Sequence, residues 1–274
     1  MVEGKIRLDV LVVEQNIAPS REKAREYILS GKIFVDDKVE RKCGRKVSED
    51  VKIELRGEVI PYVSRGGLKL EKAIKTFSIN LKDMVCLDIG ASTGGFTHCM
   101  LNFGAKKVYA IDVGSDQLAC ELKQDERVVS MENTNVKNLT LRDVGELSDF
   151  ASIDVSFISL DKVIPSVLSL IHNHGTIVAL VKPQFEAGIG RVNKKGVVKD
   201  NKIHIEVLYK VVTFLKENNL KIIGLDYSSI KGPNGNIEYL IYFTKDKSYI
   251  ESFNTSSISD VVLRSHEILN SEDI

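Results

Sequence analysis

The fold is decided by the stretch Val85-Cys-Leu-Asp-Ile-Gly-Ala-Ser-Thr-Gly-Gly-Phe-Thr97. Its apolar start predicts a buried strand, its small residues predict a turn, and a helical pattern begins near Phe96. A strand, a glycine turn and a helix in this order open a doubly wound sheet, which binds ligands at the carboxyl ends of its strands. The turn lacks the Gly-Lys-Ser/Thr ending of an ATP loop and the Gly-x-Gly-x-x-Gly spacing of an NAD site.

A second strand, Lys107 to Val113, points to a nucleoside ligand. Asp112 lies near its end, about twenty residues after the glycine turn, where a carboxylate suits the hydroxyls of an adenosine ribose. An ordinary βαβ turn is the alternative, but the two strands together favour S-adenosylmethionine as cofactor. The candidate contacts are Asp88, Gly90, Ala91, Ser92, Gly94, Gly95, Asp112 and Val113, with Asn133 and Asn135 after the third strand.

The rest of the chain continues the alternation of strands and helices. Further strands are predicted at 128–131, 150–155, 176–181, 221–225 and 238–243, and helices at 116–122, 160–171 and 203–216. Repeated βα units predict an α/β fold, here a Rossmann-like, mostly parallel sheet of seven strands with helices on both faces. The last two strands have no helix between them and should form an antiparallel edge pair. A polar tail, 249–274, carries one amphipathic stretch at 261–269, which would either dock on the domain or fray.

The size and composition of the chain exclude several classes of protein. At 274 residues the chain is long enough for one large domain and one small one. The net charge is zero, so affinity for nucleic acid must come from local patches. The four cysteines form no Cys-x-x-Cys pair, and no metal site is expected. Without a signal segment or an apolar run of membrane-spanning length, the sequence predicts a cytoplasmic protein with no membrane partner.

The sequence pattern of the first 60 residues predicts a small α+β domain. Helices are predicted at 7–13 and 21–29, the second capped by Ser20, and strands at 33–35 and 51–55. Basic residues gather here, although interleaved acids also allow a plain solvated face. The pattern Arg7-Leu-Asp-x-x-Leu, Ser20-Arg-x-x-Ala24 and Gly31-x-Ile-x-Val35 resembles the S4 RNA-binding domain. This resemblance implies structured RNA as partner. The phosphate contacts that it implies are Arg7, Arg21, Lys23 and Arg25.

Polar residues stand where several apolar strands end or begin. Asp154 belongs to the fourth strand, Lys182 follows the fifth and Glu238 opens the seventh, while Lys69 lies one turn into a helix after Gly66-Gly67. Charged side chains are rarely buried unless they are paired. A structural ion pair between Lys182 and Asp154 would explain two of them without any catalysis.

The alternative is methyl transfer to a ribose hydroxyl, which must lose its proton as it attacks. Lys182 would be the general base, because burial and neighbouring positive charge promote loss of the proton from an amine. Lys69 would supply part of that charge, and Asp154 and Glu238 would hold the two lysines in place. Phe157 and Phe185 flank this place and are candidates for stacking on a base or for simple core packing.

Six collinear motifs after the S4-like module resemble the TlyA family. They are SRGGLKLEKA (64–73), LDIGASTGGFT (87–97), IDVGSDQL (111–118), DVSFISL (154–160), LVKPQFEAG (180–188) and KGPNGNIEYL (231–240). The resemblance implies an S4 domain at 1–60 and an FtsJ/RrmJ-like, S-adenosylmethionine-dependent domain at 61–248. It also implies 2′-O-methylation of a cytidine in ribosomal RNA by a tetrad on Lys69, Asp154, Lys182 and Glu238. Ser229 departs from the proline expected before Ile230.

Three other functions remain open from the sequence. Members of this family are often labelled hemolysins, but no spanning segment or strongly cationic amphipathic helix supports membrane lysis. A non-catalytic rRNA-binding assembly factor would not need the four polar residues of the tetrad. Methylation of a base is disfavoured because Asp154-Val-Ser-Phe stands where amine methyltransferases carry an Asn-Pro-Pro-Tyr type motif.

Overall fold

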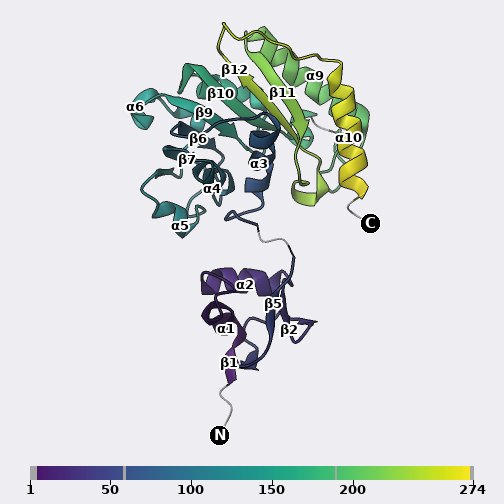
Figure 1. The fold of residues 1–274 in the computed structure, drawn as a ribbon. Coiled ribbons are helices and arrows are strands. Elements are labelled where there is room, and N and C mark those ends of the chain that lie inside the picture. The colour runs from purple at the N-terminus through teal and green to yellow at the C-terminus, as the bar shows by residue number, and fades with distance from the viewer. Residues whose placement is uncertain (1–4, 58–59, 189, 272–274) are drawn as a thin grey trace. The chain divides into compact units, whose positions relative to one another are not determined.

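The computed structural model describes residues 5–57, 60–188 and 190–271. The chain divides into two compact units, Met1–Val59 and Ile60–Ile274, each with its own helices and strands (Figure 1). Residues 58 and 59, next to the domain boundary expected after residue 60, lie outside the described residues.

The N-terminal unit packs two helices against short strands. α2 (Arg21–Leu29) has the predicted bounds, and the side chain of Ser20 accepts a hydrogen bond from the backbone of Lys23 at 3.2 Å. α1 (Leu8–Glu14) packs beside it, and their apolar faces share a core that includes Leu8 and Ile28. The strands form one pair, β1 (Lys5–Arg7) with β4 (Lys46–Ser48), and one three-stranded sheet, β3 (Lys38–Val39), β2 (Ile33–Val35) and β5 (Ile53–Leu55).

The second unit is built on the predicted sheet of seven strands, in the order β11-β12-β10-β9-β6-β7-β8. Only the pairings of β12 are antiparallel, so the prediction of a mostly parallel sheet with an antiparallel pair at one edge is confirmed. The strands are β6 (Val85–Ile89), β7 (Lys107–Ile111), β8 (Val128–Met131), β9 (Ser148–Ile153), β10 (Ile171–Val181), β11 (Lys221–Tyr227) and β12 (Tyr239–Thr244).

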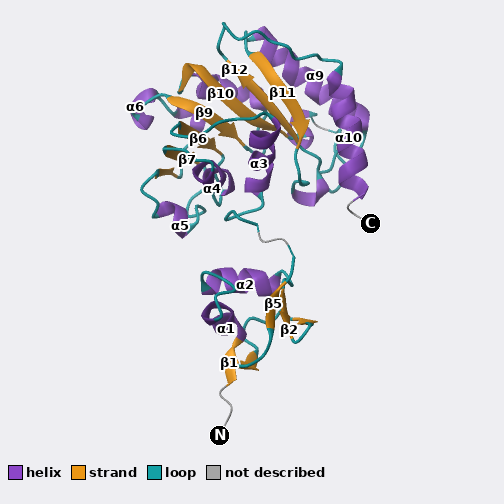
Figure 2. Ribbon diagram, viewed as in Figure 1, coloured by secondary structure: helices purple, strands orange, loops and turns teal. Residues whose placement is uncertain are grey.

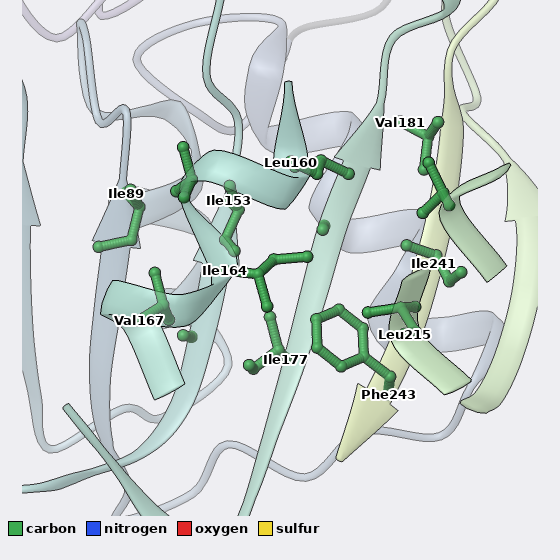
Figure 3. Close-up of a cluster of buried hydrophobic side chains, with 14 of the residues drawn as sticks. Ile89, Ile153, Leu160, Ile164, Val167, Ile177, Val181, Leu215, Ile241 and Phe243 are labelled. Carbon is green, nitrogen blue, oxygen red and sulfur yellow. The ribbon is translucent and has the colours of Figure 1, made fainter. Parts of the chain in front are cut away.

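Alternate residues of these strands enter two separate cores, because successive side chains point to opposite faces of a sheet. On one face Ile89, Ile153, Ile177, Ile241 and Phe243 interdigitate (Figure 3). Their neighbours along the strands, among them Cys86, Val108, Phe150, Val178 and Leu240, face the other core.

Helices cover both faces (Figure 2). α3 (Gly66–Thr76), α4 (Gly95–Asn102) and the short α5 (Cys120–Lys123) contribute to one core. α7 (Ile164–Leu168), α9 (Asn201–Glu217) and α10 (Ser257–Ser271) contribute to the other. Shorter helices are α6 (Leu141–Val144) and α8 (Pro183–Glu186), with 3-10 turns η1 (Val136–Asn138), η2 (Leu160–Lys162) and η3 (Pro233–Gly235). None of the helices within the described ranges is long and apolar enough to cross a bilayer.

Several details differ from the prediction. Where a helix was predicted over 116–122, only the short α5 (Cys120–Lys123) forms. The helix predicted over 160–171 is the turn η2 followed by α7, because Pro165 favours a new helix start and Ile171 already belongs to β10. β9 ends at Ile153, so Asp154 lies just beyond the strand and not within it. Of the two alternatives for the tail, docking holds, since Ile258, Val261 and Val262 of α10 are buried in the core beside α9 and β11.

Candidate active site

The four polar residues predicted as a tetrad lie together. Lys182 Nζ is 2.6 Å from Asp154 Oδ1, and Lys69 Nζ is 2.6 Å from Glu238 Oε2 and 4.0 Å from Asp154 Oδ2. The two lysines and Glu238 are buried, while Asp154 retains 19% of its side-chain exposure. The cluster therefore balances two ammonium groups with two carboxylates, and Asp154 links the lysines.

Sheet topology explains why residues so far apart in sequence meet. Asp154 and Lys182 directly follow β9 and β10, which are parallel neighbours whose carboxyl ends share one edge of the sheet. β12 runs the opposite way and pairs Tyr239 with Val181, which brings Glu238 to the same edge. Lys69 reaches the cluster from α3.

Polar neighbours orient the tetrad further. Lys182 Nζ donates a hydrogen bond to Ser156 Oγ at 3.1 Å, and Gln184 Nε2 donates to Glu238 Oε1 at 3.4 Å. A Cβ on Gly232 would lie only 2.2 Å from Glu238 Oε1, so the buried carboxylate needs a glycine beside it. Ser156 and Gln184 were missed in the sequence analysis, and their only signal is that they stand two residues after Asp154 and Lys182.

A cavity of about 500 Å³ opens beside Asp154 at this edge of the sheet. Of the ten predicted cofactor contacts it is lined by Gly90, Ser92, Asp112, Val113 and Asn135. Gln117 and Thr134 also line it and were not predicted. The carboxylate of Asp112 accepts hydrogen bonds from the backbone amides of Ser92 and Gly114, both at 2.7 Å, which fix the acid at the rim. The other predicted contacts, Asp88, Ala91, Gly94, Gly95 and Asn133, do not line this cavity.

Asp88 lies beneath the glycine turn and is fully buried. Its carboxylate accepts hydrogen bonds from Thr97 Oγ1 at 2.6 Å and Ser152 Oγ at 3.2 Å, and so ties β6 to α4 and β9. Burial raises the pKa of Asp88 to about 7, although these two hydrogen bonds act in the opposite direction. In this structure Asp88 therefore holds the glycine turn in position through hydrogen bonds to α4 and β9.

Two glycines of the turn are required by close approach of the protein's own backbone. Gly90 has φ +85°, and a Cβ there would lie 2.4 Å from the carbonyl oxygen of Asp154. A Cβ on Gly95 would lie 2.9 Å from the backbone nitrogen of Gly67, where α3 and α4 meet. The small residues thus draw the ends of β6 and β9 together and bring α3, with Lys69, close to the turn.

A second cavity of about 400 Å³ lies against the tetrad. Lys182, Gln184 and Glu238 line it, and it shares Ser156 and Phe157 with the first cavity. Phe157 has φ 63° and is 90% exposed, and its ring centroid lies 5.0 Å from that of Phe185. The two cavities meet at Ser156 and Phe157, and the tetrad residue Asp154 lines the first while Lys182 and Glu238 line the second.

This arrangement fits a nucleoside cofactor in the first cavity and a hydroxyl substrate in the second. The first cavity joins an acid near the end of β7, suited to ribose hydroxyls, with apolar walls from Ile111, Val136 and Ile158. The second presents an amine, an amide and a carboxylate, which can hydrogen-bond a sugar. No group of three or more His, Cys, Asp or Glu side chains within the described residues is arranged to hold a metal ion.

In the N-terminal unit, two of the predicted RNA contacts share one buried carboxylate. Arg7 and Arg21 both donate hydrogen bonds to Asp9, at 2.9 and 3.0 Å, and remain about half exposed. The hydrogen bond from Arg7 lowers the pKa of Asp9 to about 2. Lys23 pairs with Glu26 at 2.8 Å, and Arg25 is exposed.

Comparisons with known proteins identify the family of this chain. A model of the FtsJ-like methyltransferase family matches residues 62–245, and a model of the S4 domain matches residues 6–53. A candidate rRNA methyltransferase of Bacillus subtilis, YqxC, is 47% identical over 88% of this chain and 86% of its own. The 16S/23S rRNA (cytidine-2′-O)-methyltransferase TlyA of Mycobacterium tuberculosis is 38% identical over 87% of this chain and 89% of its own. A solved structure of a candidate hemolysin from Streptococcus thermophilus aligns with a TM-score of 0.78, 42% identity and coverage of 99% of both chains.

Proposed function

Because the chain belongs to the FtsJ-like methyltransferase family and carries an S4 domain before the catalytic domain, we propose that it methylates the 2′-hydroxyl of a cytidine in ribosomal RNA, with S-adenosylmethionine as methyl donor. The substrate class follows the name of the similar Mycobacterium tuberculosis protein. The observation that carries the proposal is the position of Lys182 and Glu238 in the second cavity, directly beside the cavity suited to the cofactor.

In the proposed complex, Asp112 at the rim of the first cavity accepts hydrogen bonds from the cofactor's ribose, and Gly90, Ser92, Val113 and Asn135 form the walls. Bound S-adenosylmethionine supplies an electrophilic methyl group on a positively charged sulfur. Asp88, Gly94 and Gly95 act indirectly, by shaping the turn, while Ala91 and Asn133 belong to the same two loops.

Lys182 is the proposed general base. The Nζ atom pairs with Asp154 Oδ1 at 2.6 Å, and Lys182 lines the second cavity. In its neutral form, Lys182 would take the proton from a ribose hydroxyl bound in that cavity. Glu238 and Asp154 hold the lysines in place, and this positioning supplies part of the acceleration.

The S4 domain is proposed to bind the RNA by its backbone and shape. Arg7 and Arg21 support this because Asp9 orients both guanidinium groups while leaving them half exposed to a phosphate. Arg25 is exposed, and Lys23 would exchange its partner Glu26 for a phosphate.

The test is mass mapping of ribosomal RNA nucleosides after incubation with the protein and S-adenosylmethionine. A new 2′-O-methylcytidine that depends on the protein is the expected result. Methylation of a base would contradict the proposal. So would the absence of any methylated nucleoside when free rRNA and both ribosomal subunits have been tested as substrates. Leakage of liposomes caused by the pure protein at low concentration would instead support the literal meaning of the hemolysin label.

A further inference from the structure

In addition to the basic residues of the S4 domain, the catalytic domain carries a basic surface of its own. This surface is formed by residues 191–202, which we call the lysine loop and which run from beyond α8 into the first turn of α9. The loop carries five basic residues, Arg191, Lys194, Lys195, Lys199 and Lys202, and a single acidic residue, Asp200. The Asp200 side chain accepts a hydrogen bond from the Lys202 backbone at 2.9 Å and caps α9. In a chain of zero net charge, this is a strong local excess.

The central lysines of this loop are not paired. Lys194, Lys195 and Lys199 are exposed, and no carboxylate of the described residues lies within 4.0 Å of their ammonium groups. Arg191, in contrast, pairs with Glu206. Like charges held close together repel one another and gain when an anion neutralises them.

These lysines line a cavity and do not lie on a flat surface. Lys194, Lys195 and Lys199 line a hollow of about 780 Å³ together with Lys231 and His266. Asn234 belongs both to this hollow and to the second cavity of the active site. Val192 and Gly196 of the lysine loop also line that second cavity. One short loop thus borders both the proposed acceptor site and a basic hollow.

Hydrogen bonds join the lysine loop to the segment that carries Glu238. Asn236 Nδ2 donates a hydrogen bond to the Gly196 carbonyl at 3.1 Å, and Asn236 Oδ1 accepts one from the Val198 backbone at 3.2 Å. Asn193 Oδ1 accepts from the Lys195 and Val197 backbones at 2.8 and 3.0 Å and fixes the turn itself. The lysines are therefore held at a defined place relative to the tetrad.

We propose that the lysine loop and Lys231 bind backbone phosphates of the RNA strand next to the methylated nucleotide, and so place the target ribose in the second cavity. This inference rests on the proposed function, because it takes the second cavity as the acceptor site. RNA is favoured over other anions because a strand whose ribose occupies the second cavity continues into the adjoining hollow with a phosphate at every nucleotide.

The test compares the full-length wild-type chain with the triple variant Lys194→Ser, Lys195→Ser, Lys199→Ser. The matched control replaces Lys82, Lys106 and Lys247, which are exposed, unpaired within the described residues and located at the opposite edge of the sheet. Binding of fluorescently labelled, deproteinised rRNA fragments is measured at several salt concentrations, and methyl transfer is measured against RNA concentration.

For the loop variant we expect at least roughly tenfold weaker RNA binding at moderate salt, and a plot of log K against log salt that is flatter by about two units. The KM for RNA should rise while kcat at saturating RNA and cofactor affinity stay within about twofold of wild type, which also shows that the variant is folded. The control variant should match wild type.

Equal RNA affinity and salt slope in the loop variant and wild type would overturn the inference. A general loss in both variants would also overturn it, because the effect would then be one of net charge. A wild-type chain that binds RNA through the loop but transfers no methyl group would contradict the proposed function instead, so the two failures can be told apart.

Discussion

Lys69 and Glu238 stand 169 positions apart in the chain, yet Lys69 Nζ lies 2.6 Å from Glu238 Oε2, and both side chains are at least nine-tenths buried. Removing one member of such a pair leaves a buried charge without its partner, whereas replacing both with apolar residues is often nearly neutral. The pair therefore allows stability and catalysis to be separated.

Glu238→Gln should lower the free energy of unfolding by about 3 kcal/mol. For a domain of this size that corresponds to a fall of roughly 6–12 °C in the melting temperature, measured by calorimetry. The double variant Lys69→Met, Glu238→Leu should recover most of that stability and yet transfer no methyl group. A double variant that is active would show that the pair has only a structural role.

Lys182→Ala should lower kcat for methyl transfer by roughly a hundredfold to ten-thousandfold, the range for loss of a general base. Cofactor binding, measured by calorimetry, should persist because Lys182 does not line the first cavity. Lys182→Arg is the informative partner, since it keeps the positive charge beside Asp154 but does not release its proton. Substantial turnover by Lys182→Arg would mean that position 182 supplies charge alone.

Asp154, Lys182 and Glu238 could be predicted from the sequence because charged residues that border apolar strands are conspicuous, and because parallel strands end at one edge. Lys69 lies on a helix, and its membership of the tetrad was implied by the family resemblance. The residues that hold the site in place could not be predicted in the same way. Asp88 stands at the right place for a cofactor contact, but the register of β6 and β9 sets it opposite Ser152, and Thr97 takes its other oxygen. Such pairings depend on strand register, which a single sequence does not reveal.

The same limit explains α10. The amphipathic pattern at 261–269 indicates that one face of a helix could be buried. It does not indicate which part of the protein covers that face. The structure supplies α9 and β11 as that surface, so the helix completes the core of the catalytic unit. Likewise, the glycines of the turn were attributed to a ligand. Gly90 does line the first cavity, but Gly90 and Gly95 are also required by Asp154 and Gly67 of the protein itself.

Asp112→Ala should weaken S-adenosylmethionine binding by roughly tenfold to a hundredfold, because hydrogen bonds to a charged acceptor contribute about 1.5–3 kcal/mol. Part of the loss will come from the turn, since Asp112 also accepts from Ser92 and Gly114. Titration calorimetry measures the effect. Asp125→Ala, which removes a carboxylate paired with Arg127 just before β8, at the edge of the sheet away from this cavity, is the control and should bind like wild type. Unchanged affinity in Asp112→Ala would place the cofactor's ribose elsewhere.

Asp9 should make the N-terminal unit sensitive to acid. Its pKa in the folded chain is about 2, below the value of about 3.9 in an unfolded chain. A lowered pKa stabilises the fold above pH 4, and this stabilisation is lost as the pH falls from about 4 to about 2. The expected loss is about 1–2 kcal/mol, reduced by solvent around the half-exposed Arg7 and Arg21. Hydrogen exchange of amides in α1 and α2, corrected for intrinsic rates, should show falling protection over this range. In Asp9→Asn the protection should be lower at pH 6 and change less with pH, and a wild-type profile in that variant would show that the two arginines draw no stability from Asp9.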